Sequence, residues 1–227
     1  MANPTQKSKF TLEQVDNAIS RLSLIPGSGP LTAADVGAAP AGYGLGAAPK
    51  SVSSWDEATV SGWYKGPAPA GFGYGTIWGR VDALKSGYIA QVIYLDANPN
   101  CSAMRECING TWKAWEWVNP PMLTGVEYRT TERYNGKPVY VKIVDCGKMP
   151  SATTSTIDPG VENILYRISV EAMMYYSVDD TWTLPLNNGT HDASCWFNNK
   201  GINVRSAQTG LSAYTCYATI KYTKKTD

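Results

Sequence analysis

Hydrophobic and polar side chains alternate along much of this chain with a period of two, the pattern of half-buried β-strands. Between residues 164 and 174, one strand face would carry Ile164, Tyr166, Ile168, Val170, Ala172 and Met174. Residues 214–223 repeat this alternation, and shorter strands are expected at 139–144, 182–184, 195–197 and 202–204. Strands at this spacing, separated by Asp-Pro-Gly and Asn-Asn-Gly turns, predict a β-sandwich over residues 120–227.

A second group of predicted strands precedes the first one along the chain. Its members are expected at residues 62–64, 76–81, 88–94, 105–108 and 111–117. Asn109-Gly110 joins the last two, and this dipeptide is a strong signal for a two-residue hairpin turn. Asn119-Pro120-Pro121 then marks a boundary. We therefore expect a small β domain at residues 54–119, and the fold class is all-β.

The N-terminal part has a different pattern. Leu12, Val15, Ile19 and Leu22 are spaced as an a/d seam, which predicts a helix over residues 11–22. Two heptads are too few for a strong coiled coil alone. We expect residues 1–29 to form a short self-associating bundle; the alternative is an amphipathic helix packed on its own domain.

Residues 30–53 form an Ala/Gly/Pro repeat. VGAAPA at 36–41 is followed by the near copy LGAAPK at 45–50. Such a segment has too little large apolar surface to build a core. It is either a flexible linker or a thin connector that is stabilised where several copies of the chain lie together.

Composition and charge exclude several classes of function. The net charge is +1 and no basic run is present, which argues against nucleic acid as a partner. No window is apolar enough to insert into a membrane, and MANPTQKSKF does not read as a secretory signal, so we expect assembly in the cytoplasm. With 8 Trp and 14 Tyr among 227 residues, the chain instead suits recognition by amphipathic rings.

Little in the sequence points to chemistry. The single histidine, His191, has no G-x-S-x-G nucleophile motif to serve, so we expect no enzyme, no cofactor and no metal site. Asp179-Asp180 is interpreted as a turn cap, with cation or sugar binding as the alternative. The five cysteines, at 101, 107, 146, 195 and 216, are expected to be buried free thiols. Pairing of Cys101 with Cys107 across a turn is the other possibility.

Several motifs within residues 54–118 carry a resemblance to a known family. In order they are Gly62-Trp63-Tyr64, a glycine-rich loop, Trp78-Gly79, Gln91, Arg105 and the closing Asn109-Gly110-Thr111-Trp112-Lys113-Ala114-Trp115. This segment resembles the knob domain of pyocin and phage tail fibres. The VGAAPA repeat is similar to connectors in such fibres, and the YNGKPVYVKIVDCG string resembles the start of the C-terminal heads of prophage tail fibres. Trp63, Trp78, Trp112 and Trp115 are expected to be structural.

The resemblance implies a homotrimeric fibre of a phage or phage-like particle, located in the virion. Residues 120–227 would be its receptor-binding head, which adsorbs to a glycan or protein of the bacterial surface, and other tail or baseplate proteins would be its partners. Two alternatives are a glycan-depolymerising tail enzyme and a purely structural spacer.

Amides beside aromatic rings are the best lead to a binding site. Sugars stack their C–H faces on Trp or Tyr, while amide, carboxylate and imidazole groups hydrogen-bond to hydroxyls. We expect the loops 177–183 and 187–200 at the exposed tip. The candidate glycan-binding residues are Trp182, Asn188, His191, Asp192, Trp196, Asn198 and Asn199. Alternatively, Trp196 belongs to the core and the amides serve turns.

Overall fold

The fold was analysed in a computed structural model, which describes residues 49–69, 72, 75–95 and 98–226. Within these ranges the chain is all-β, as predicted, with one short 3-10 turn η1 (Trp55–Glu57) and no α-helix. The predicted helix at 11–22 and all but the last two residues of the VGAAPA repeat lie outside the described residues.

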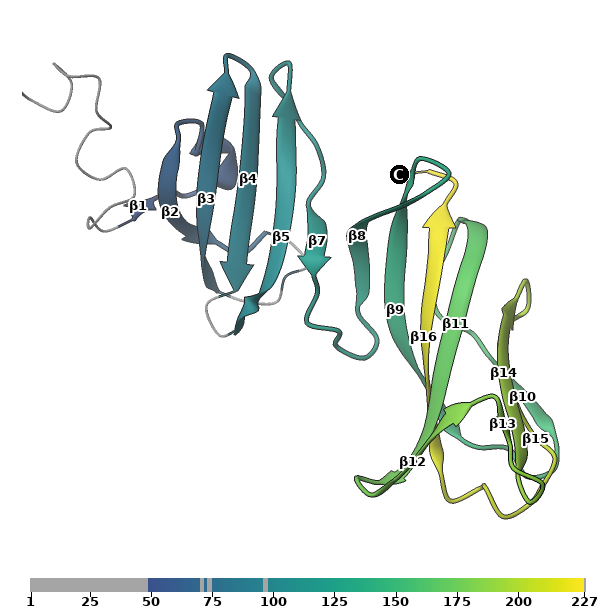
Figure 1. Cartoon of the computed structure of the whole chain (residues 1–227). Coiled ribbons are helices and arrows are strands. Elements are labelled where there is room, and N and C mark those ends of the chain that lie inside the picture. Colours follow the sequence, from purple (N-terminus) through teal and green to yellow (C-terminus); the bar gives the residue numbers. More distant parts are fainter. Residues whose placement is uncertain (1–48, 70–71, 73–74, 96–97, 227) are drawn as a thin grey trace, which may run out of the picture. The chain divides into compact units, whose positions relative to one another are not determined.

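The strands between Lys50 and Asn119 form an antiparallel sheet in which β2, β3, β4 and β5 are neighbours in sequence order (Figure 1). β6 and β7 both pair with β5. The strands are β1 (Lys50–Ser51), β2 (Gly62–Pro67), β3 (Thr76–Lys85), β4 (Tyr88–Leu95), β5 (Asn98–Ile108), β6 (Thr111–Trp112) and β7 (Glu116–Asn119). Every strand predicted here is confirmed except 111–117, which is broken between β6 and β7. The Asn109-Gly110 hairpin is confirmed, and both residues have positive φ.

Trp55 is the centre of the first core. Its indole lies against Gly79, where an added Cβ would come within 2.6 Å of the ring, so only glycine leaves room for it. The ring nitrogen donates to the Pro67 carbonyl at 2.8 Å, which satisfies the one polar atom of the buried side chain. Of the eight tryptophans, Trp55 and Trp117 are the buried ones, at 4 % and 5 % exposure. Among the four tryptophans expected to be structural, Trp112 and Trp115 are partly buried and pack against this core, whereas Trp63 is 38 % exposed.

A buried amide fixes η1 to the sheet. The Gln91 side chain is fully buried on β4, and its Nε2 donates to the carbonyls of Trp55 and Ala58 at 2.7 and 2.9 Å. Its Oε1 accepts from Arg105 at 2.9 Å. The Arg105 guanidinium lies over the rings of Trp112 and Trp115, 4.1 and 4.6 Å from their centroids. The buried amide is therefore fully hydrogen-bonded, which a core polar group requires.

Residues from 127 onward form two sheets that share a core, so the predicted β-sandwich is present (Figure 1). The first is the run β8-β9-β16-β11-β12, which continues the sheet of β1 to β7 through the pairing of β7 with β8. The second is a separate sheet with the order β10-β15-β14-β13. The strands of the first are β8 (Glu127–Tyr134), β9 (Lys137–Lys148), β16 (Thr215–Lys224), β11 (Ile164–Ser177) and β12 (Asp180–Leu184). Those of the second are β10 (Thr154–Ile157), β15 (Gly201–Ser206), β14 (Asp192–Asn198) and β13 (Leu186–Asn187).

The core of the sandwich combines small and medium side chains with the fully buried ring of Tyr222. The first sheet supplies Ala172, Met174, Cys216, Ala218, Ile220 and Tyr222, and the second supplies Ala193, Ile202 and Val204. Val141 of β9 and Tyr128 of β8 instead belong to the Trp55 core, although both lie beyond residue 119.

The alternation predicted for 164–174 is wrong in its first half. Register shifts between Ile164 and Tyr166 and between Arg167 and Ser169 each insert an extra residue in β11. Such bulges move the following side chains to the other face. Tyr166 is therefore exposed and contacts Tyr134, with ring centroids 5.6 Å apart.

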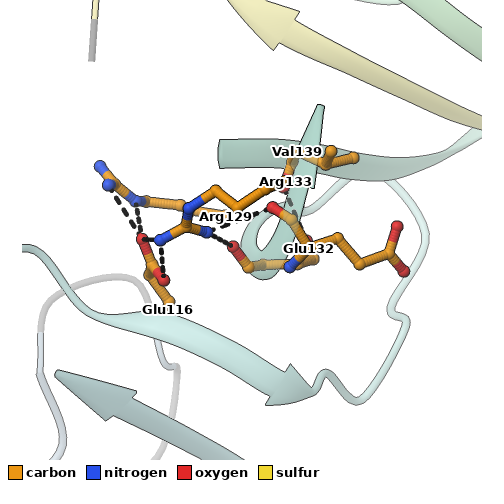
Figure 2. Close-up of polar contacts among 6 residues, drawn as sticks. Glu116, Arg129, Glu132, Arg133 and Val139 are labelled. Carbon is orange, nitrogen blue, oxygen red and sulfur yellow. Dashed lines mark hydrogen bonds and ion pairs between the residues drawn. The ribbon is translucent and has the colours of Figure 1, made fainter. Parts of the chain in front are cut away.

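Two arginines of β8 converge on one carboxylate of β7, as Figure 2 shows. Both Oε atoms of Glu116 accept from Arg133 at 2.7 Å, and Oε1 also accepts from Arg129 at 3.0 Å. β7 and β8 share only one ladder pair, the parallel pair of Trp117 and Thr130. The ion pairs are thus the main polar connection between these two strands.

The described cysteines are free thiols, and all but the half-buried Cys195 are buried, as expected. Pairing of Cys101 with Cys107 is wrong, because both lie on β5 and not across a turn. Six residues along a strand separate them by roughly 20 Å, whereas a disulfide needs Cα atoms within about 7 Å.

Thiol and phenol groups in the interior make the stability of the sandwich depend on pH in the alkaline range. Burial raises the pKa of Cys195 from 9.0 to about 12. Burial and a hydrogen bond to Glu127 also raise the pKa of Tyr222. Above about pH 9 these groups ionise in the unfolded chain and stay protonated in the folded one, so stability falls as pH rises.

We therefore predict that the midpoint of urea unfolding, measured under reducing conditions, falls steadily from pH 8 to about pH 11. Cys195→Ala removes one of the responsible groups and should make this fall shallower. A midpoint that stays level over this range would contradict the burial of these groups.

A second prediction concerns Glu116. Glu116→Ala removes a carboxylate whose side chain is only 14 % exposed and which pairs with both Arg129 and Arg133. The free energy of unfolding should fall by about 1–3 kcal/mol. The matched control is Glu132→Ala, whose pair with Lys221 is more exposed and should contribute less than about 1 kcal/mol. Equal losses for the two variants in denaturant titrations would contradict the role of Glu116.

Candidate functional site

Trp196 lies outside the core, on the outer face of the four-stranded sheet. Along β14, Ala193, Cys195 and Phe197 pack into the sandwich core. Because side chains alternate along a strand, Trp196 points to the other face, and its side chain is 38 % exposed. The interpretation in which Trp196 is a core residue is therefore wrong.

The neighbours of Trp196 on this face form a hydrogen-bonded row. Trp196 lies opposite Asn203 of β15, which lies opposite Thr156 of β10. Asn203 is buried; its Oδ1 accepts from the Thr156 hydroxyl at 2.9 Å, and its Nδ2 donates to the Gly201 carbonyl at 3.1 Å. The indole thus lies beside polar side chains that are held in place.

Two residues further along β15 and on the same face, Arg205 lies opposite Ser194. Its guanidinium reaches Asp192 at 3.4 Å, and the two side chains are 45 % and 41 % exposed. Both charges therefore remain accessible to a ligand. We name this surface the Trp196 face: Asp192, Ser194, Trp196, Asn198, Asn203, Arg205, Thr154 and Thr156.

The structure does not gather the predicted residues of 187–200 into one cluster. Asn188, His191 and Asp192 lie at one end of β14, and Asn198 and Asn199 lie at the other. The seven residues from Asp192 to Asn198 span roughly 20 Å of strand. Trp196, Asp192 and Asn198 nevertheless share one face.

Two of the predicted amides hold turns. The Asn188 side-chain oxygen accepts from the backbone N–H groups of Thr190 and His191, at 3.1 and 2.7 Å. The Asn198 oxygen accepts from the Lys200 N–H at 2.9 Å. These bonds are the ones expected of Asn in turns, and they leave the side-chain NH₂ groups as the donors available to a ligand.

Trp182 belongs to a different surface. It lies on β12 of the five-stranded run, opposite Met174 of β11, and its ring nitrogen donates to Asp180 at 2.7 Å. Trp196 faces away from this sheet, so one saccharide ring cannot contact both indoles.

Sequence reasoning missed Asn203, Arg205 and Thr156 on the Trp196 face. Ile202-Asn203-Val204-Arg205 alternates apolar and polar residues, which could have placed Asn203 and Arg205 together on a solvent face. Thr156 carried no such signal, because its nearness depends on the pairing of β10 with β15.

Within the part of the chain that the structure describes, His, Cys, Asp and Glu do not come together in threes to hold a metal ion. Nor does this part include a helix of the length and apolar character needed to span a bilayer.

No protein-family model and no curated protein matches the chain. Solved structures of pyocin tail fibres align with it. An N-truncated R2-type pyocin tail fibre matches over 78 % of this chain and 96 % of its own, at 14 % identity and a TM-score of 0.27. An R1 pyocin fibre from P. aeruginosa matches over 76 % of this chain at 11 % identity and a TM-score of 0.26. This chain covers 66 % of that structure. TM-scores of this size do not establish a shared fold.

Proposed function

We propose that the chain is a receptor-binding protein of a phage or phage-like tail fibre, and that its Trp196 face adsorbs to a glycan of the bacterial surface. One observation carries the proposal: a half-exposed indole lies on a sheet face among fixed polar side chains. The motifs of residues 54–118 and the VGAAPA repeat support the assignment to a fibre.

The chemistry of this face suits a saccharide. An indole offers a flat apolar surface for the C–H face of a sugar ring. Arg205 donates to hydroxyl oxygens, and Asp192 accepts from hydroxyl hydrogens. Ladder pairs on both sides of Trp196 hold the strand, so little conformational entropy is lost when a ligand binds.

We further propose that the fibre is a homotrimer, located in the virion and attached to other tail proteins. Three copies would present three Trp196 faces, and avidity could strengthen weak single-site binding by about 10²–10⁴-fold. The N-terminal a/d seam and the small-residue repeat support association.

Light scattering of the intact chain tests whether it is a trimer. We expect three times the chain mass of 24.6 kDa at micromolar concentration. A monomer under these conditions would contradict the trimer and leave the Trp196 face to be tested by itself.

The adsorption test compares two tryptophans of equal exposure. Trp196→Ala should weaken adsorption to host cells by about tenfold or more, because a loss of about 1.4 kcal/mol per site already has this effect. Its free energy of unfolding should change by less than about 1 kcal/mol, since the side chain lies outside the core.

Trp63→Ala is the matched control, because Trp63 is also 38 % exposed but lies on β2, outside the sandwich. It should adsorb like the wild-type chain. Wild-type adsorption by folded Trp196→Ala would overturn the assignment of the site. Turnover of the host polysaccharide by the wild-type chain would favour a depolymerase instead.

A further inference from the structure

A single carboxylate lies between two aromatic side chains at the start of β12. Asp180 Oδ1 accepts from the Trp182 ring nitrogen at 2.7 Å, and Oδ2 accepts from the Tyr214 hydroxyl at 2.6 Å. The Tyr214 ring is in turn 5.6 Å from that of Tyr176. Trp182 of β12 and Tyr214, in the segment before β16, thus both donate to one carboxylate, and Tyr176 of β11 packs against Tyr214.

The rings of this cluster are open to solvent. Tyr176 is 61 % exposed and Trp182 is 38 % exposed, and Val178 in the turn between β11 and β12 is 83 % exposed. Large apolar side chains gathered in one exposed place indicate an interaction site more often than isolated ones do. The cluster is therefore accessible as well as ordered.

Asp180 retains hydrogen-bonding capacity. A carboxylate has about four acceptor positions, and the two protein donors occupy one on each oxygen. Among the described residues, no Lys or Arg forms an ion pair with Asp180. The free positions can accept from two neighbouring hydroxyl groups of one ligand.

We propose that Asp180, Trp182 and Tyr176 form a second saccharide-binding site, which takes neutral pyranose sugars. The rings supply the stacking surface and the carboxylate accepts from adjacent hydroxyls. This site is separate from the Trp196 face and does not depend on it.

The charge at the site sets the ligand class. Asp179 and Asp180 are adjacent, so a uronate or a phosphorylated sugar would meet like charge. Charge repulsion therefore favours a neutral sugar over an acidic one. The Trp196 face differs, because Arg205 there offers a positive charge beside Asp192.

The test uses saturation-transfer NMR on the full chain carrying Trp196→Ala, which removes the indole of the other face. The neutral probes are methyl α-mannopyranoside and methyl β-galactopyranoside at millimolar concentration, and sodium glucuronate is the acidic probe. We expect transfer to at least one neutral probe and none to glucuronate.

Two further variants locate the contact. Asp180→Asn removes the charge and one acceptor at nearly constant shape, and Tyr176→Ala removes a largely exposed ring. Each should weaken binding by about tenfold or more, with the melting temperature unchanged for Tyr176→Ala. Thr219→Ala, on the outer face of β16, is the control and should bind like its parent.

Three results would overturn the proposal: no transfer to either neutral probe, transfer that persists in both variants, or equal transfer to glucuronate. A lower oligomeric mass of Tyr176→Ala in light scattering would also overturn it, because the cluster would then be an interface between copies. None of these results bears on adsorption through Trp196, so failure here is distinguishable from failure of the proposed function.

Discussion

The register between β14 and β15 is the constraint on which the rest of the account depends. From Ala193 opposite Ser206 to Asn198 opposite Gly201, six consecutive pairs are formed without a shift. A slip of one residue would turn Trp196 into the core and Phe197 out to solvent. The core permits only the observed register, since Ile202 and Val204 of β15 are fully buried against the facing sheet.

Two further features fix the same register: the turn that joins β14 to β15, and the close approach of β10 to β15. Asn198 accepts from the Lys200 N–H, and Gly201 has a φ of +130°, a conformation that other residues rarely adopt. A Cβ at position 201 would lie 2.4 Å from the Ile157 carbonyl oxygen, so β10 approaches as closely as it does only because residue 201 is glycine. The position of Thr156 beside Asn203 follows from this approach.

Most strands could be predicted from the sequence, because one face of each is buried and the alternation is therefore visible. The prediction failed where the backbone departs from a regular ladder. The bulges of β11 move Tyr166 to the outer face, and β6 ends at Trp112, whose ring lies over the Arg105 guanidinium. For the candidate site, sequence reasoning found Trp196 and Asp192 but not Arg205 or Asn203, because strand pairing and not sequence distance brings them together. It also joined Trp182 to Trp196, since nothing local in the sequence shows that the chain changes sheets between them.

The central claim is that the Trp196 face is what meets the host surface. Hydroxyl-radical footprinting of the intact chain, free and bound to cells that it adsorbs to, tests this claim without any mutation. Oxidation of Trp196 should fall on binding, while that of Trp63, equally exposed in the free chain, should stay the same. An unchanged rate at Trp196 in the bound chain would contradict the claim.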